Sequence, residues 1–221
     1  MMSKVVIFGT GDLSEIVHGS IGQEGFHEVC GFTVHENYRR ESTFQGLEVV
    51  PFEQVEEVFP PDEFEMFVAV GYNRINRARS EIYALCKQKK YKMITYISPR
   101  ASLLGSVTTG DNCFIGENTV IRTSTRIGNG VIIGACCYIG QNTTIGDHCF
   151  VAQSASLSGN LTIEDYAFIG PNATIRDRVR IGSSCVIGAG AVILGDTAPN
   201  GVYRARRAEE LAVRSHNLKD L

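Results

Sequence analysis

A glycine-rich turn near the N-terminus is the first group of residues that could do chemistry. Gly9, Thr10, Gly11 and Asp12 follow the apolar run of residues 5–8 and precede a helix-like segment. Between a strand and a helix, such a turn offers backbone N–H groups to a phosphate at the helix N-terminus. Ser14 stands where the dinucleotide-binding pattern has its third glycine. A tight structural turn, with Asp12 as a helix cap, therefore explains these residues equally well.

Histidines are the side chains best suited to accept a proton near neutral pH, and the chain has five. His18, His27, His35 and His216 show no triad or metal-ligand spacing, so we interpret them as surface or capping residues. There is no Cys-x-x-Cys pair among the seven cysteines. We therefore expect no metal site.

Arginines gather in the last third of the chain. Because a guanidinium stays charged and binds phosphate in a bidentate manner, such a cluster could hold a phosphorylated ligand. A solubilising edge is the alternative. The arginines concerned are Arg176, Arg178, Arg180, Arg204, Arg206 and Arg207.

Composition limits the class of protein. The 221 residues (24.2 kDa) are 43% hydrophobic and 20% charged, as in a soluble globular protein. The 21 basic and 24 acidic residues give no electrostatic footprint for nucleic acid. No apolar stretch is long enough to span a bilayer, and the N-terminal apolar run is too short for a signal peptide. We expect a cytoplasmic protein that binds neither membrane nor nucleic acid.

A six-residue repeat defines the second half of the chain. From Ile97 to Ile193, an aliphatic residue recurs every six positions, with Thr109 as the exception. A helical period of 3.6 residues cannot produce this series. Glycine often follows the aliphatic residue, and a small or β-branched residue lies two positions before it. Four cysteines stand in this small-residue column, so we interpret them as core residues: Cys113, Cys137, Cys149 and Cys185.

Three hexads suit one triangular coil of 18 residues, and stacked coils form a parallel β-helix. The first half alternates expected strands (5–8, 29–34, 66–70 and 92–97) with expected helices (51–59 and 73–90). This order indicates a parallel sheet covered by helices, of the size of one mononucleotide-binding half of a Rossmann fold. We expect three parts: an α/β domain (1–96), a β-helix (97–203) and a C-terminal capping helix or arm (204–221).

The combination resembles the sialic-acid O-acetyltransferase-like family of bacterial sugar acyltransferases, which includes N-acetyltransferases of nucleotide-linked amino sugars. The resemblance implies a left-handed β-helix and a homotrimer, with acyl-CoA between adjacent β-helices and the nucleotide sugar at the α/β domain. It rests on four segments: Ile7-Phe8-Gly9-Thr10-Gly11, Val70-Gly71-Tyr72-Asn73, Leu157-Ser158-Gly159-Asn160 and Ile187-Gly188-Ala189-Gly190-Ala191.

The resemblance also implies site residues. The residues expected to face the nucleotide sugar are Gly9, Thr10, Gly11, Asp12, Thr33 and Asn73. The residues expected to bind acetyl-CoA, as a co-substrate, are Gly159, Gly170, Asn172, Gly188, Gly190, Arg206 and Arg207.

One departure from the family concerns catalysis. The family usually has a histidine general base two residues after an aliphatic position, where this chain has Gln141, followed by Asn142. Glutamine can orient a nucleophile but cannot accept its proton. His148 lies one hexad later, at the next corner of the coil; it is either a catalytic residue that faces a neighbouring subunit or a solvated corner histidine.

These residues favour an acyl-CoA-dependent N-acyltransferase, because a neutral amine needs no general base to attack a thioester. The product would serve surface-polysaccharide synthesis, such as that of the lipopolysaccharide O-antigen. Two alternatives stay open: a sugar O-acetyltransferase, and a catalytically silent scaffold that binds nucleotide sugars.

Overall fold

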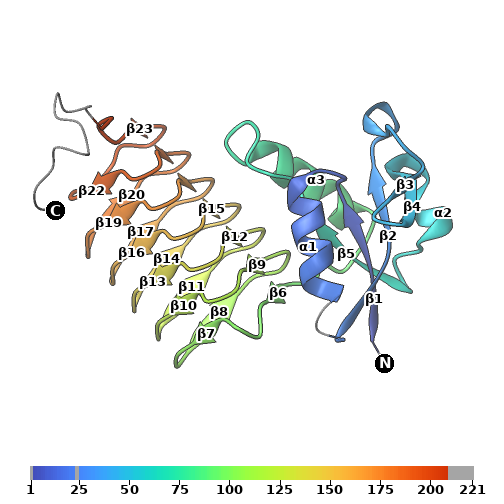
Figure 1. The fold of residues 1–221 in the computed structure, drawn as a ribbon, viewed down its shortest axis with the longest axis horizontal. Helices are drawn as coiled ribbons and strands as arrows, with labels where there is room; N and C mark the ends of the chain where they lie inside the picture. Colours follow the sequence, from blue (N-terminus) through green and yellow to red (C-terminus); the bar gives the residue numbers. More distant parts are fainter. Residues whose placement is uncertain (1, 23–24, 209–221) are drawn as a thin grey trace, which may run out of the picture.

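The computed structural model describes residues 2–22 and 25–208. An N-terminal α/β region lies beside a prism of stacked coils (Figure 1). The α/β region contains β1 (Ser3–Phe8), α1 (Asp12–Gly22), β2 (His27–Val34), β3 (Thr43–Phe44), β4 (Leu47–Pro51), α2 (Val55–Val58), β5 (Phe64–Val68) and α3 (Arg77–Gln88). Two short 3₁₀ helices, Glu36–Tyr38 and Phe52–Gln54, follow β2 and β4.

The strands of this region form a five-stranded sheet in the order β3-β4-β2-β1-β5. The expectation of a purely parallel sheet is wrong at one edge, because β3 and β4 pair antiparallel. Gln45 and Gly46 join them with φ values of 50° and 78°, which suits a two-residue hairpin turn. The strand expected at 92–97 is reduced to an isolated bridge between Met66 and Met93, followed by Tyr96 and Ile97 at the start of the β-helix.

Alternation along β1 builds two cores. Val5 and Ile7 pack with α1 on one face of the sheet, and Val6 and Phe8 pack on the face that α3 covers. The first of these cores also contains Phe114 and Ile132, which belong to the β-helix. The α/β region and the β-helix therefore share a hydrophobic core.

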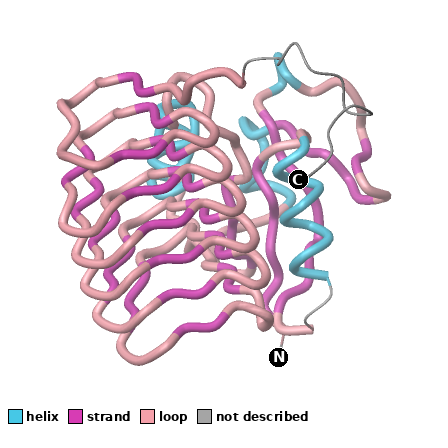
Figure 2. Tube along the Cα trace, turned by 60° about the vertical axis from the view of Figure 1, so that its left-hand side comes forward, coloured by secondary structure: helices cyan, strands magenta, loops and turns pink. Residues whose placement is uncertain are grey.

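The hexads form short strands in three parallel sheets, which Figure 2 shows as the sides of a prism. The seven-stranded sheet contains β6 (Tyr96–Ile97), β9 (Phe114–Ile115), β12 (Ile132–Ile133), β15 (Phe150–Val151), β18 (Phe168–Ile169), β21 (Val186–Ile187) and β23 (Val202–Tyr203). The six-stranded sheet contains β7 (Ser102–Leu103), β10 (Val120–Ile121), β13 (Tyr138–Ile139), β16 (Ser156–Leu157), β19 (Thr174–Ile175) and β22 (Val192–Ile193). The five-stranded sheet contains β8 (Val107–Thr109), β11 (Thr125–Ile127), β14 (Thr144–Ile145), β17 (Thr162–Ile163) and β20 (Arg180–Ile181).

The expected left-handed β-helix is confirmed. Partners in neighbouring strands lie 18 residues apart, as in the pair Ile121 and Ile139, so three hexads make one coil. The aliphatic column and the small-residue column fill the prism, and the four cysteines named above are buried and free. Because β6 begins at Tyr96, we propose that the boundary between the domains lies just before this residue.

Residues with positive φ mark the three corners of the prism. The first corner, which leads into the seven-stranded sheet, has Asn112, Gly130, His148, Tyr166 and Ser184 in this conformation. The second corner, between the seven- and six-stranded sheets, has Asn118, Cys136, Ser154, Asn172 and Gly190. The third corner, which leads into the five-stranded sheet, has Ser124, Asn142, Asn160 and Arg178.

The expected C-terminal capping helix falls largely on residues 209–221, which lie outside the described residues. Residues 204–208 follow β23 without regular structure. Within residues 2–22 and 25–208, no helix is both long and apolar enough to cross a bilayer.

Candidate functional site

A cavity of about 580 Å³ opens at the carboxyl edge of the α/β sheet. Four of the residues predicted to face a nucleotide sugar line it together: Gly9, Thr10, Gly11 and Asn73. The ends of β1, β2 and β5 form its floor, and Ala78, Glu81 and Ile82 of α3 form one wall. This is the edge at which open α/β sheets bind ligands, because the loops after the strands meet there.

Two predicted residues are placed differently. Thr33 is 0% exposed and does not line the cavity: its hydroxyl donates to the Val50 carbonyl (2.8 Å), and its carbonyl accepts the N–H of Gly9 (2.9 Å). Thr33 thus supports the glycine turn from below. Asp12 is exposed as the first residue of α1 and does not line the cavity.

Gly9 and Gly11 differ in whether the fold tolerates a side chain at their positions. Gly9 has φ of 126°, and a Cβ there would lie 2.5 Å from Ser14 Oγ and 2.8 Å from the Ala69 carbonyl oxygen. Any side chain at Gly9 would therefore strain the fold. A Cβ at Gly11 would meet nothing within 4 Å, so a substitution there changes the cavity and leaves the backbone unstrained.

Sequence reasoning missed the polar residues that complete the cavity. His35 lines it at the end of β2, and its Nδ1 lies 2.8 Å from Glu53 Oε1. This hydrogen bond holds the pKa of Glu53 below its usual value. Arg74 and Glu81 also line the cavity and form an ion pair with each other. The position of these residues after the strands, at the carboxyl edge of the sheet, was the signal that could have identified them. Their spacing in the sequence forms no motif.

Gln141 and Asn142 lie exposed at the third corner, in the turn after β13. Gly159 lies one coil further along the same corner, and a Cβ on it would lie 2.9 Å from Gln141 Nε2. Asn142 Nδ2 donates to Asn160 Oδ1 (3.2 Å). The structure therefore brings Gln141, Asn142 and Gly159 together into an uncharged amide and glycine surface.

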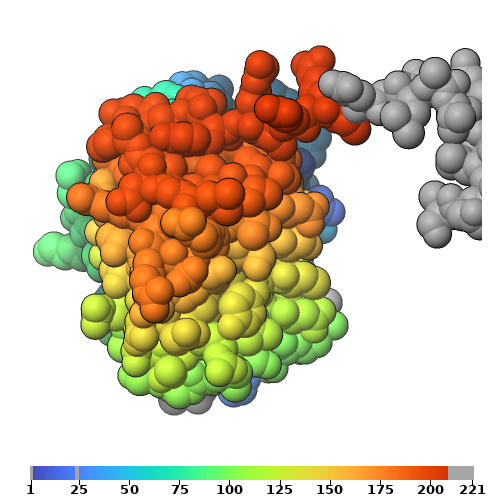
Figure 3. Space-filling view, turned by 90° about the vertical axis from the view of Figure 1, so that its left-hand side faces the viewer, coloured from blue at the N-terminus to red at the C-terminus, as the bar shows by residue number. Residues whose placement is uncertain are grey.

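The other predicted acyl-CoA residues belong to the last coils of the prism and to the segment after them, which Figure 3 shows in orange and red toward the top of the molecule. A hollow of about 960 Å³ is lined there by Gly188, Ala189 and residues 204–207, which include Arg206 and Arg207. Gly170 is buried against the backbone of the next coil, and Asn172 and Gly190 are exposed at the second corner. Within one chain, this group is at a different corner from Gln141 and Gly159.

His148 lies at the first corner and is not solvated, contrary to one of our two expectations. It is 7% exposed, and its ring lies between Tyr83 of α3 (5.1 Å between centroids) and Tyr166 (5.6 Å). Among the residues that the structure describes, its buried Nδ1 has no hydrogen-bond partner. Burial, and then the nearby Arg79 charge, lower the pKa of His148 from its ordinary value. This position does not bring His148 to Gln141.

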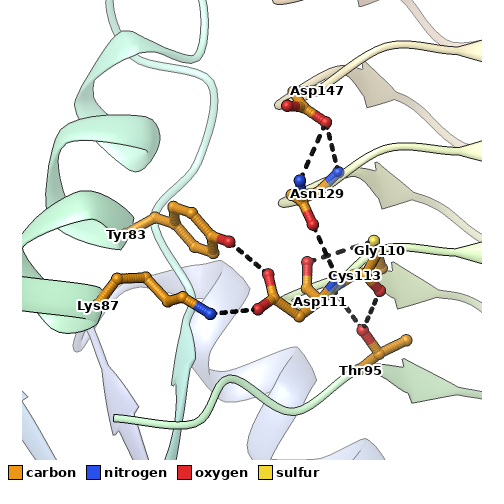
Figure 4. Close-up of polar contacts among 8 residues, drawn as sticks. All are labelled: Tyr83, Lys87, Thr95, Gly110, Asp111, Cys113, Asn129 and Asp147. Carbon is orange, nitrogen blue, oxygen red and sulfur yellow. Dashed lines mark hydrogen bonds and ion pairs between the residues drawn. The ribbon is translucent and has the colours of Figure 1, made fainter. Parts of the chain in front are cut away.

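The helix α3 covers this corner and fixes the two parts of the molecule to each other. Figure 4 shows Tyr83 and Lys87, one turn apart on α3, both bonded to the carboxylate of Asp111 in the β-helix. Burial, and then this hydrogen bond, raise the pKa of Tyr83. Asn129 and Asp147 continue the ladder along the corner, with Asn129 N–H 2.7 Å from Asp147 Oδ1. Within residues 2–22 and 25–208, no three His, Cys, Asp or Glu side chains are grouped to hold a metal.

Comparisons with known proteins agree with this architecture. The model of the bacterial transferase hexapeptide (six repeats) matches residues 124–159 and 160–195, and that of the hexapeptide repeat of succinyl-transferase matches residues 106–141. No curated protein sequence matches the chain.

Similar folds occur in solved structures. The acetyltransferase domain of PglB from Neisseria gonorrhoeae has a TM-score of 0.82 and 24% identity, over 94% of this chain and 99% of that one; a second structure contains acetyl coenzyme A. PerB from Caulobacter crescentus, in complex with CoA and GDP-perosamine, has a TM-score of 0.83 and 22% identity, over 93% and 95%. WeeI from Acinetobacter baumannii has a TM-score of 0.65 and 18% identity, over 91% and 96%.

The family models match the repeats that build the prism, and the solved structures share the order of an α/β region followed by a β-helix. Residues 106–195 are therefore built of hexapeptide repeats of the bacterial transferase type.

Proposed function

We propose that the protein is an acyl-CoA-dependent N-acyltransferase that acetylates the amino group of a nucleotide-linked amino-dideoxy sugar. One observation carries the proposal: the likeness to PglB and PerB covers more than nine-tenths of the chain, and so includes both the sheet-edge cavity and the prism. PglB is described with acetyl coenzyme A, and PerB with CoA and GDP-perosamine.

The nucleotide sugar is assigned to the cavity of the α/β region. Thr10 and Gly11 offer backbone N–H groups beside the N-terminus of α1, which favours the diphosphate, whereas the N–H of Gly9 is bonded to the Thr33 carbonyl and Gly9 shapes the turn. Asn73 and His35 add side-chain hydrogen bonds at the same cavity. Asp12 would repel a phosphate, so we propose that it does not contact the nucleotide sugar. Thr33 is buried, and we propose that it supports the glycine turn through its hydrogen bonds.

The acyl-CoA is assigned to a cleft between two subunits. Gln141 and Gly159 belong to the third corner, whereas Gly188, Arg206 and Arg207 belong to the second. One chain cannot bring these groups to one ligand, but a threefold arrangement sets the second corner of one subunit against the third corner of the next. The arginines would bind phosphate groups of CoA, and Gly170, Asn172 and Gly190 would lie along its arm.

The chemistry needs no histidine. A neutral amine attacks the thioester carbonyl, so that the C–N bond forms, the C–S bond breaks, and the released CoA thiolate or a water takes the amine proton. The protein supplies proximity, worth up to roughly 7–11 kcal/mol, and donors for the oxyanion. Gln141 and Asn142 orient the amine through their amides.

Two alternative functions are judged from the residue at position 141. A sugar O-acetyltransferase would have to deprotonate a hydroxyl, which an amide at position 141 cannot do. A catalytically silent scaffold would keep the cavity and lose turnover, and Gln141 is the residue that favours this alternative.

An assay of CoA thiol release separates these functions. Purified protein is incubated with acetyl-CoA and a panel of nucleotide-linked amino sugars, each paired with its hydroxyl analogue. The N-acyltransferase releases thiol with an amino sugar and not with the analogue. Release with the hydroxyl sugar supports O-acetylation, and nucleotide-sugar binding without any release supports the scaffold.

A further inference from the structure

The segment between β5 and α3 carries an unusual backbone. Residues 69–71, 73 and 74 line the cavity, and the segment then closes with Arg74, Ile75 and Asn76 at φ values of 52°, 51° and 64°. Three consecutive non-glycine residues in the left-handed region are costly, and most so for the β-branched Ile75. Such a conformation persists where the surrounding structure holds it.

Asn76 holds the last residue of this turn. Its side chain is 0% exposed, and Nδ2 donates to the carbonyls of Tyr166 (3.1 Å) and Ala167 (3.3 Å) in the β-helix. Its Oδ1 accepts a hydrogen bond from Arg79 Nη1 (3.1 Å). The left-handed turn is therefore attached to the first corner and not to the α/β sheet.

Arg79 forms the second attachment, because it donates hydrogen bonds both to the cavity wall and to the β-helix. Its guanidinium is 0% exposed, and Nη1 also donates to the Gly71 carbonyl (3.0 Å) in the cavity wall. On the β-helix side, Nε donates to the Gly130 carbonyl (3.1 Å) and Nη2 to the His148 carbonyl (2.8 Å). Burial lowers the pKa of Arg79 to about 10, so the group stays charged at neutral pH.

We infer that Asn76 and Arg79 are positioning residues for the nucleotide-linked substrate: they fix the cavity wall, residues 70–74, to the β-helix that carries the acyl donor. Neither residue lines the cavity, so both act through the wall. The inference rests on the proposed function, because it gives the cavity that substrate. It explains why the strained turn of residues 74–76 directly follows Asn73, at the point where the two parts of the molecule meet.

The variants Asn76→Gly and Ile75→Gly form a matched pair. Glycine adopts a φ near 64° without cost, so Asn76→Gly removes the attachment and leaves the backbone conformation allowed. Ile75→Gly relieves strain one residue earlier and leaves the bonds of Asn76 and Arg79 in place. Arg79→Lys is the second test, since lysine keeps the charge but has a single nitrogen.

The readouts are the KM for the nucleotide amino sugar, the KM for acetyl-CoA, the Tm, and hydrogen exchange of the amides of residues 69–74. For Asn76→Gly and Arg79→Lys we expect faster exchange and a rise of about tenfold in the nucleotide-sugar KM, because small misplacements in a site are costly. The acetyl-CoA KM stays within about twofold of wild type, since its residues lie on the β-helix. Ile75→Gly leaves both KM values unchanged and raises the Tm.

Several results would overturn the inference. If exchange is faster but the nucleotide-sugar KM is unchanged, the wall does not position the substrate, although the proposed function still holds. If both KM values rise together as the Tm falls, the two residues are merely structural. If the wild-type protein acylates no nucleotide sugar, the proposed function fails and the inference fails with it, whatever the exchange data.

Discussion

Gln141 and His148 are seven positions apart in the chain but lie at different corners of the prism: Gln141 is exposed at the third corner, whereas His148 is buried at the first corner beneath α3. Where the sequence resemblance implies a histidine, this chain thus has the amide of Gln141, and the one histidine of the repeats lies between the rings of Tyr83 and Tyr166. The proposed catalysis without a general base depends on this separation.

The burial of His148 predicts a pH-dependent stability. Its folded-state pKa lies below the ordinary value of 6.5, so the unfolded chain binds a proton more readily than the folded one. The neutral ring's contribution is complete above pH 6.5 and is lost as the pH falls toward the folded-state pKa. Arg79 disfavours the proton, whereas Asp147, Asp165 and Asp111 partly offset this effect.

The variant His148→Asn tests this prediction, because asparagine accepts the positive φ of 57° at this position. We expect the Tm of wild type to fall more between pH 7.5 and about 5.5 than the Tm of the variant, which is lower at neutral pH because the ring's packing is lost. Parallel curves for the two proteins would show that His148 does not titrate on unfolding.

The hexads made the parallel β-helix and its register predictable, because each coil repeats the same inward aliphatic residue. Its left-handedness came from the family resemblance and not from the repeat. The β3–β4 hairpin was missed because Gln45 and Gly46 form its turn with positive φ, which the residue types only weakly suggest. The prediction that His148 could be a solvated corner residue was wrong, because α3 packs over this corner. The hexad pattern does not show which element covers a corner. In the sequence, Asn76 and Arg79 resemble ordinary helix-surface residues.

The six-stranded sheet is the face through which we expect the proposed homotrimer to assemble. Its outward-facing side chains carry no charge, and two of them, Tyr138 and Val192, are large, apolar and exposed. The outward-facing residues are Ser102, Val120, Tyr138, Ser156, Thr174 and Val192. We expect light scattering to give three times the 24.2 kDa chain mass for the wild type. Tyr138→Asp should lower the mass toward that of one chain, and Thr144→Asp on the five-stranded sheet should not. A monomeric wild type would remove the shared acyl-CoA cleft.

Gly11→Val tests the nucleotide cavity. A Cβ at this position meets no described protein atom within 4 Å, so we expect valine to spare the fold and to fill the space that the diphosphate needs. We expect calorimetry to show at least about tenfold weaker binding of the nucleotide sugar, with an unchanged Tm. Gly19→Val, in equally open space further along α1, is the control. Unchanged binding by Gly11→Val would make the turn purely structural.

Arg206 and Arg207 are expected to contact CoA phosphates. Replacing both with alanine should raise the KM for acetyl-CoA about tenfold or more, since hydrogen bonds to charged groups contribute about 1.5–3 kcal/mol each. The loss should be smaller with dephospho-acetyl-CoA, which lacks the 3′-phosphate. The control variant Arg126→Ala, on the five-stranded sheet, should leave the KM values for acetyl-CoA and for dephospho-acetyl-CoA unchanged. An equal loss with both donors would place the arginines at the diphosphate and not at the 3′-phosphate, and no loss with either donor would contradict a contact with CoA phosphates.

The pH dependence of kcat/KM for the nucleotide amino sugar tests the central claim most directly. If the free amine is the nucleophile and no side chain accepts its proton, kcat/KM rises with the deprotonation of the substrate amine. Gln141→Ala then lowers the rate less than about tenfold at every pH, and His148→Asn gives the same profile as wild type. A loss of about 10³-fold in His148→Asn, or a profile that follows an ionisation of the enzyme, would mean that a general base is present and would contradict this mechanism.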